Sequence, residues 1–254
     1  MKMNMKRHSY VRFMTVLIGL LALSPLAEAH YLWIESQPSQ GKTSAPSQVE
    51  IYYGEFEESL REKAGGRLDE VGPIETWLLN SSEKVEITVQ KKENYFETTF
   101  DEASTVNPRL IQLQELTRPV QDWRAYDIGI AKPNYYAGAL VLGPDADILH
   151  LSVPAHKTAL GIYPVSLGDE LIFQVFFKDT PFSNAKFNVH APNGWSKEYK
   201  TDESGTVRFR LPWAGQYVFE VINLEKKSGV FQGVSYEAIR HRATFSWKAP
   251  GTSR

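Results

Sequence analysis

The chain has 254 residues, of which 42% are hydrophobic and 12% aromatic; it contains no cysteine, and its formal net charge is −2. The lack of cysteine excludes disulfides, thiolate metal sites, cysteine nucleophiles and lipidation at a cysteine after a signal peptide. No stripe of basic residues occurs, which argues against a nucleic-acid partner.

The first 29 residues have the layout of a secretory signal peptide. Basic residues end at Arg12, an apolar run occupies 13–23, and residues 27–29 (AEA) form an A-x-A cleavage site. The apolar run is shorter than the ~20 residues that cross a bilayer. We therefore predict cleavage after Ala29, a periplasmic location and no membrane span in the mature chain. Since the leader holds four basic residues and one acidic residue, the mature chain keeps 24 basic and 29 acidic residues.

Short segments with alternating or aromatic character predict strands in the N-terminal part of the mature chain. The charged segment 55–63 (EFEESLREK) instead predicts a short surface helix, and residues 84–90 and 95–100 alternate cleanly and predict a hairpin. Residues 108–129 have weak periodicity, which leaves their structure open. Further strands are predicted at 30–35, 49–54, 135–142 and 148–153.

The last hundred residues have the clearest β pattern. Several short strands at regular spacing, joined by turn residues, indicate a β-sandwich. These strands are predicted at 169–178, 186–191, 206–211, 216–221 and 243–247. The predicted chain is thus mainly β, with a signal peptide (1–29), a β-rich N-terminal domain (30–159) and a sandwich domain (160–250).

The segment 200–217 (KTDESGTVRFRLPWAGQY) resembles the strand-turn-strand signature of transthyretin-like and carboxypeptidase-regulatory-like sandwiches. In that pattern Asp202 and Gly205 form the turn, and Gly215 with Tyr217 restarts the next strand. The resemblance implies an immunoglobulin-like or transthyretin-like C-terminal domain. The alternative is a generic β-hairpin.

Four segments together resemble the DUF4198 family of exported bacterial proteins, and they cover nearly the whole mature chain. They are 30–35 (HYLWIE), 52–70 (YYGEFEESLREKAGGRLDE), 132–139 (KPNYYAGA) and 173–221, which begins FQVFF and ends QYVFEV. The resemblance implies a periplasmic component of nickel or cobalt uptake, with a membrane transporter component as partner. Some members carry histidines after the strand that corresponds to 216–221, where this chain reads Ile-Asn-Leu at 222–224.

Cleavage after Ala29 would make His30 the N-terminal residue. An α-amine has a pKa near ~8 and an imidazole near ~6.5, so both groups lose their protons at small cost around neutral pH. One residue then offers two nitrogen ligands in a small chelate ring, and a second histidine would complete the three-nitrogen histidine brace of copper proteins. Such ligands suit Cu(II) first and Ni(II) next. The alternative is that the leader happens to be cut before a histidine that binds no metal.

The predicted second metal ligand is His241, which opens the last predicted strand on the face of Phe245 and Trp247. The alternative for His241 is a core histidine with hydrogen-bonded ring nitrogens. His190 is predicted to be solvated, opposite the apolar face of its strand. All four methionines lie in the leader, which excludes a thioether Cu(I) site in the mature chain.

The sequence therefore predicts a periplasmic protein that binds Cu(II) or Ni(II) through His30, in metal uptake or handling, without enzyme activity. The acidic segment 55–70 is read as a solvated face, with a carboxylate site as the alternative. A second reading is a metal-free module that binds a glycan or another envelope protein through an exposed aromatic patch. The residues predicted for that patch are Trp33, Tyr52, Tyr53, Tyr135 and Tyr136. A third reading is a copper-dependent oxidative enzyme that uses the same brace.

Overall fold

The chain is mainly β, as its sequence pattern predicts. The structure, a computed structural model, describes residues 30–37, 47–79, 83–100, 109–142 and 147–250. Over these residues it forms four sheets and two short 3-10 helices, with no α-helix. None of the helices in this part of the chain is long and apolar enough to cross a membrane. The predicted leader lies outside the described residues.

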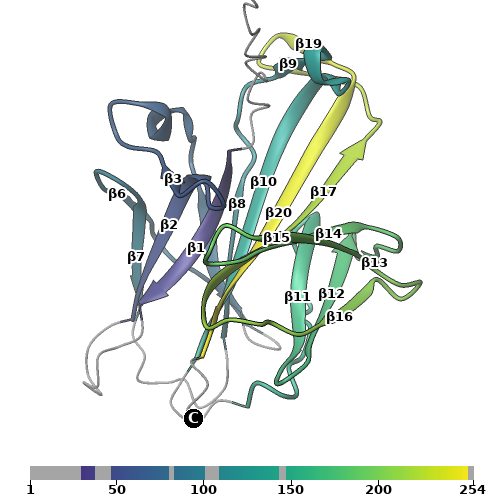
Figure 1. The fold of residues 1–254 in the computed structure, drawn as a ribbon. Helices are drawn as coiled ribbons and strands as arrows, with labels where there is room; N and C mark the ends of the chain where they lie inside the picture. The colour runs from purple at the N-terminus through teal and green to yellow at the C-terminus, as the bar shows by residue number, and fades with distance from the viewer. Residues whose placement is uncertain (1–29, 38–46, 80–82, 101–108, 143–146, 251–254) are drawn as a thin grey trace, which may run out of the picture.

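A nine-stranded sheet forms the centre of the molecule, and Figure 1 shows its two longest strands, β10 and β20, running side by side. It consists of β4 (Glu75–Leu79), β5 (Lys84–Glu86), β8 (Arg109–Glu115), β9 (Gln121–Trp123), β10 (Gly129–Val141), β14 (Lys186–His190), β15 (Ser196–Lys200), β17 (Gly215–Glu225) and β20 (Ala238–Ala249). All neighbours in it are antiparallel except β10 and β20, which are parallel.

Three smaller sheets complete the described structure. The five-stranded sheet contains β1 (Tyr31–Gln37), β2 (Ser47–Glu55), β3 (Leu60–Arg61), β6 (Gln90–Lys91) and β7 (Phe96–Phe100). The four-stranded sheet contains β11 (Leu160–Leu167), β12 (Leu171–Phe177), β13 (Thr180–Pro181) and β16 (Thr206–Phe209). The remaining elements are the β18 (Gly229–Phe231) and β19 (Val234–Tyr236) hairpin and the 3-10 helices η1 (Arg67–Glu70) and η2 (Arg124–Tyr126).

The central sheet has two apolar faces because successive side chains on a strand point to opposite sides. On β10, Tyr136 and Leu140 pack in one core with the four-stranded sheet, whereas Ala137 and Ala139 pack in another core with the five-stranded sheet. In the first core Phe173 of β12 lies 4.8 to 5.9 Å, between ring centroids, from four other phenylalanine rings. The four-stranded and five-stranded sheets therefore cover opposite faces of the central sheet.

β1 is an edge strand of the five-stranded sheet, and side chains of β20 form hydrogen bonds with backbone groups on its open edge. The backbone N–H of Ile34 donates to Oγ of Ser246 at 3.2 Å, and Oγ1 of Thr244 donates to the carbonyl of Leu32 at 2.7 Å. Thr244 and Ser246 occupy alternate positions of β20 and so lie on one face of it. Because an unpaired buried backbone group costs about 1–3 kcal/mol, these bonds hold β1 against the central sheet.

One prediction in the N-terminal part is wrong and a second is confirmed only in part, because of how the strands pair. Residues 55–63 form a turn and the short β3 instead of a helix, since β3 pairs back onto the end of β2 at Gly54 and Glu55. The hairpin predicted for 84–90 and 95–100 forms only at the end of its first arm, where Gln90 pairs with Glu97. β5 pairs with β4 in the central sheet, and only β6 pairs with β7 in the five-stranded sheet. The chain crosses from one sheet to the other between β5 and β6.

A third prediction is also wrong, since residues 148–153 form no strand although Leu151 N donates to the carbonyl of Val165 at 2.9 Å. The open region 108–129 contains β8 and β9. The other N-terminal strand predictions are confirmed by β1, β2 and β10.

The strands predicted for the last hundred residues all occur, as β12, β14, β16, β17 and β20. The turn at Asp202 is confirmed, because Gly205 has a φ of +72° and its N–H donates to the carbonyl of Asp202 at 3.0 Å. Gly215 begins β17, and the hydroxyl of Tyr217 donates to the carbonyl of Trp213 at 3.0 Å. The domain boundary between 159 and 160 stays a prediction, and the central sheet takes strands from both sides of it.

Candidate functional site

His30 lies at the start of β1 with its imidazole buried between two carboxylates. The residue is 5% exposed. Its Nδ1 is 3.0 Å from Oε1 of Glu55, and its Nε2 is 2.5 Å from Oε1 of Glu62. The ring of Tyr53 packs beside it, 5.3 Å between centroids. Both ring nitrogens of His30 are therefore turned toward acidic oxygens in a site that excludes most water.

The return of the chain at Gly54 brings the two carboxylates to His30. Gly54 has a φ of +152°, and a Cβ at this position would lie 2.1 Å from the carbonyl oxygen of Leu60. Only glycine allows β3 to approach β2 so closely. The N–H of Glu62 then donates to the carbonyl of Tyr53 at 2.9 Å. Glu55 at the end of β2 and Glu62 just after β3 are thus held on the same side of the sheet.

A guanidinium group completes the immediate surroundings of the His30 ring. Nη1 of Arg67 lies 3.3 Å from both ring nitrogens. Its Nε is 3.2 Å from Oε1 of Glu70, and Oε2 of Glu70 accepts a hydrogen bond of 2.8 Å from the buried Arg118. Two acidic groups and one basic group therefore surround the imidazole, and the basic group has an acidic partner away from the ring.

A buried ion pair lies on the central-sheet side of His30. Nη1 of Arg242 donates to the carbonyl of His30 at 3.3 Å, and its Nε donates to Glu220. Burial alone would raise the pKa of Glu220, but the Arg242 charge and the hydrogen bond with His190 lower it to about 2. Arg242 also lies over the ring of Tyr31, 4.4 Å from its centroid. This ion pair links the candidate site to β17 and β20.

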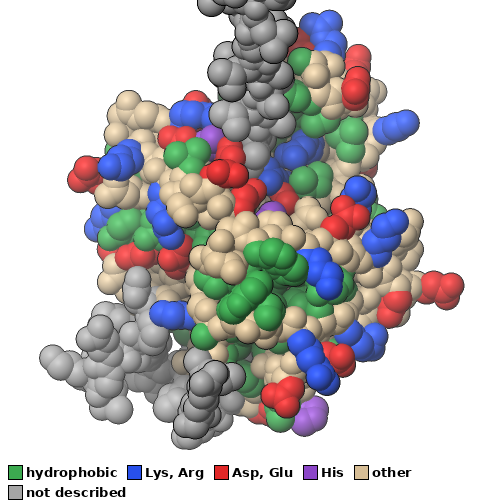
Figure 2. All heavy atoms as spheres, viewed as in Figure 1, with side chains coloured by type: hydrophobic (Ala, Val, Ile, Leu, Met, Phe, Trp, Pro, Cys, Tyr) green, Lys and Arg blue, Asp and Glu red, His purple; other side chains and the backbone are tan. Residues whose placement is uncertain are grey.

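The hydroxyl of Tyr31 donates a hydrogen bond to a third carboxylate, that of Glu57. The same hydroxyl accepts a 3.1 Å hydrogen bond from Phe56 N. Burial raises the pKa of Tyr31, and the neighbouring charge of Glu57 raises it further, so the hydroxyl keeps its proton. Figure 2 shows acidic, basic and histidine side chains gathered where the N-terminal and C-terminal halves of the molecule meet. The candidate site belongs to a charged network and not to an apolar seam.

His241 lies on the opposite face of β20 from Arg242 and β1. Its Nδ1 is 3.0 Å from the hydroxyl of Tyr136, and its Nε2 is 3.1 Å from Oε2 of Glu225. Burial lowers the pKa of His241, although Glu225 opposes the shift. The structure therefore does not bring His30 and His241 together, since the central sheet separates their side chains. Both ring nitrogens of His241 have partners within the core, which matches the alternative stated for this residue.

Two other sequence predictions near the site are wrong. His190 is buried and not solvated, because its Nδ1 is 2.9 Å from Oγ of Ser196 and its Nε2 is 3.5 Å from Oε2 of Glu220. The aromatic side chains expected to form an exposed patch lie inside the molecule, where β1, β2 and β10 are covered by neighbouring sheets. Trp33, Tyr53, Tyr135 and Tyr136 are buried, and Tyr52 is half-buried.

The sequence did not identify Glu55, Glu62 and Arg67 as partners of His30. All three come from the acidic segment 55–70, and that segment was the only available signal. The two carboxylates lie at opposite ends of the His30 ring and do not converge on one point. Accordingly, no group of three or more His, Cys, Asp or Glu side chains in the described ranges is arranged to hold a metal ion.

Comparison of the chain with protein-family models gave no match. Comparison with curated proteins also gave no match. The resemblance to DUF4198 and its link to nickel or cobalt uptake therefore stay predictions.

Proposed function

We propose that the protein is an exported carrier of a divalent transition metal, Cu(II) or Ni(II), which it binds through the mature N-terminus at His30. The observation that carries this proposal is the burial of the His30 imidazole between Glu55 and Glu62. The metal is cargo, and the proposal includes no enzyme activity. A transthyretin-like C-terminal domain and a transporter partner belong to the same proposal.

The donor atoms around Nδ1 suit such a metal. In the mature chain the α-amine and Nδ1 of His30 would form a chelate, and the Glu55 carboxylate 3.0 Å from Nδ1 would supply an oxygen ligand. Two nitrogens and one carboxylate oxygen are ligands that Cu(II) and Ni(II) accept in tetragonal sites. Because His30 provides two of these donors itself, the site does not depend on His241.

Glu62 has a different role in the proposal. A metal-binding histidine usually donates its other ring N–H to a carboxylate, which fixes the tautomer and the ring orientation. Glu62 lies 2.5 Å from Nε2 and is suited to accept that hydrogen bond. Nδ1 is then the nitrogen left for the metal. The two carboxylates at opposite ends of the ring thus act as ligand and as orienting partner.

Arg67 opposes the metal, because its guanidinium lies 3.3 Å from both ring nitrogens and carries a like charge. The Arg67 guanidinium also contacts Glu70, which gives it a position to occupy away from the His30 ring. We infer that Arg67 holds the site closed in the metal-free protein and turns toward Glu70 when metal binds. Arg67 thereby limits the affinity of the carrier, which is a useful property in a protein that must also release its cargo.

The test compares three glutamate variants in the mature protein that begins at His30. Glu55→Gln should weaken Cu(II) affinity at least tenfold, and Glu62→Gln should weaken it about 10- to 100-fold as an outer-shell change. Glu58→Gln is the matched control, because Glu58 lies in the same segment with an exposed side chain. Affinity is measured by competition with a chelator and by the shift in unfolding temperature that metal produces. Equal affinity in all three variants would overturn the proposal.

A second candidate function is a metal-free interaction module, and one observation favours it. Trp195 and Trp213 are 40% and 42% exposed and pack edge to face, 5.7 Å between ring centroids. Figure 2 shows a hydrophobic patch near the centre of the visible face, with basic and acidic side chains on its right. Exposed aromatic side chains are typical of surfaces that contact a partner. Loss of binding to isolated cell envelopes in a Trp195→Ala, Trp213→Ala double variant, with metal affinity unchanged, would favour this candidate.

A further inference from the structure

β5 is the end strand of the nine-stranded sheet, and none of the described strands pairs with its outer edge. Its residues, Lys84, Val85 and Glu86, are all exposed, and Val85 is 52% exposed. An open edge presents unpaired N–H and C=O groups, which form a template for pairing with another chain. The exposed valine between two charged residues therefore makes β5 a candidate surface for strand pairing with a partner.

The backbone groups of Lys84 and Glu86 point to the open edge. The N–H of Ile87 donates to the carbonyl of Thr76 at 2.9 Å, so the backbone groups of Ile87 face β4. In an antiparallel pair, successive residues alternate between facing the neighbouring strand and facing away from it. Val85 lies two positions before Ile87 and therefore also faces β4 with its N–H and C=O. The groups of Lys84 and Glu86 are left for a strand on the other side.

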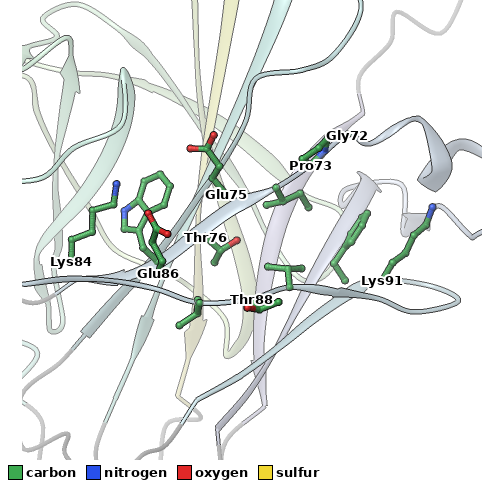
Figure 3. A pocket seen from close by; sticks show the side chains of 13 residues that line it. Gly72, Pro73, Glu75, Thr76, Lys84, Glu86, Thr88 and Lys91 are labelled. Carbon is green, nitrogen blue, oxygen red and sulfur yellow. The ribbon is translucent and has the colours of Figure 1, made fainter.

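The two charged side chains of β5 lie on one face of the sheet, because they are two positions apart on a strand. Figure 3 shows Lys84 and Glu86 on the same side of the strand. Within the described ranges neither side chain is in an ion pair. The ammonium of Lys84 lies over the Trp77 ring, 4.0 Å from its centroid. Contact with a ring face does not occupy the N–H donors of the ammonium, which can still pair with a carboxylate.

We propose that β5 pairs with the β5 of a second copy of this chain, antiparallel and about a two-fold axis at Val85. Since Val85 then lies opposite itself, Lys84 of each copy lies opposite Glu86 of the other. The outward N–H and C=O groups of these two residues exchange backbone hydrogen bonds in that register. Their side chains are opposite in charge, an arrangement that stabilises antiparallel pairs. The two valine side chains meet on the other face, at the position where cross-strand neighbours are closest.

The order base, valine, acid selects a second copy of the chain as the partner. This order is complementary to itself when reversed, so a two-fold pair satisfies both charges of both copies at once. Because β5 is short, with only Lys84–Glu86 in the strand, the contact is small and the dimer should be weak. It should form at high protein concentration and dissociate on dilution. The inference is independent of the proposed metal site, because His30 precedes β1 in the other sheet.

The first measurement is the mass of the mature protein by small-angle X-ray scattering, over concentrations up to ~1 mM. The wild type should change from monomer toward dimer as the concentration rises. Lys84→Glu leaves only acidic side chains at the pair, and Glu86→Lys leaves only basic ones, so either variant should weaken the dimer about tenfold or more. A wild type that stays monomeric throughout, or a Lys84→Glu protein that dimerises as tightly as the wild type, would overturn the proposal.

Mixing the two variants separates strand pairing from a general loss of structure. Lys84→Glu and Glu86→Lys should form a dimer together that neither forms alone, because the acids of one lie opposite the lysines of the other. The double variant with both changes should dimerise as the wild type does, since acid, valine, base is again self-complementary. Lys227→Glu, the same charge change at an exposed position between β17 and β18, is the control and should leave the dimer unchanged. A mixture that stays monomeric would contradict the proposed register.

Discussion

Replacing Glu220 by glutamine measures how strongly the structure around His30 depends on one buried ion pair. The side chains of Glu220 and Arg242 are 4% and 5% exposed. Glutamine keeps the volume of the side chain but leaves the Arg242 charge without its counter-ion. Breaking a buried pair in this way typically costs about 3–5 kcal/mol. Because Arg242 also donates to the carbonyl of His30, the start of β1 should loosen with it.

The acid dependence gives a second magnitude, for the interactions of Glu220 with Arg242, His190 and Asn188 together. The pKa of Glu220 is about 2 in the folded chain against an ordinary 4.5, and a difference of this size corresponds to about 3 kcal/mol. Since the folded pKa is the lower one, this stabilisation is complete above pH 4.5. It is lost as the pH falls from 4.5 toward 2. The variant should therefore be least stable relative to the wild type near pH 7, and the gap should narrow below pH 4.5.

The assay is urea unfolding followed by tryptophan fluorescence, for wild type and variant, from pH 7 to pH 2.5. Glu198→Gln is the control, because Glu198 pairs with Lys186 at 3.2 Å on the surface. Exposed pairs contribute less than about 1 kcal/mol, so this variant should stay close to wild type. A Glu220→Gln protein within 1 kcal/mol of wild type at pH 7, or a gap that does not narrow in acid, would refute the reasoning.

Three further variants have expected outcomes. Thr244→Val leaves the carbonyl of Leu32 without its partner and should destabilise the protein by about 1–3 kcal/mol in urea unfolding at pH 7; a smaller loss would mean that β1 is held in another way. Arg67→Ala removes the cation beside His30 and should raise Cu(II) affinity several-fold in a competition titration, and weaker binding would contradict the inferred role. His241→Gln should leave Cu(II) affinity unchanged, because the central sheet separates it from His30, and a marked loss in the same titration would reinstate it as a ligand.

The strands of the C-terminal half could be predicted because each one shows its own alternation and its own turn. Asp202 and Gly205 mark the tight turn, and Gly215 marks the start of β17. The segment 84–90 alternates equally well, but alternation does not say which sheet a strand joins. Its two ends pair with different sheets, and no local feature of the sequence indicates that change.

The environment of His30 could be predicted only in part. Sequence reasoning singled out His30 itself and placed His241 correctly on the face of Phe245 and Trp247. It could not foresee that β1 packs on the other face of β20, because this depends on pairing β10 with a strand about a hundred residues later. The contact of Glu55 and Glu62 with His30 could not be predicted either, because an acidic segment next to a turn usually faces solvent.

The burial of the aromatic residues follows from the same topology. In β1, Tyr31 and Trp33 pack in one cluster while Leu32 and Ile34 pack in another, so both faces of the strand are covered. A short apolar run of this kind is consistent with a strand buried on both sides, but it also fits an exposed aromatic patch when the neighbours are unknown.

The most direct test of the central claim is a titration of the mature protein with Cu(II) and Ni(II), compared with a version that carries one added glycine before His30. The added residue keeps the imidazole, Glu55 and Glu62 but moves the α-amine away from Nδ1. The proposal predicts stoichiometric binding to the protein that begins at His30 and a loss of that binding in the extended form. Equal binding by both forms, or binding by neither, would contradict a metal site built on the N-terminal histidine.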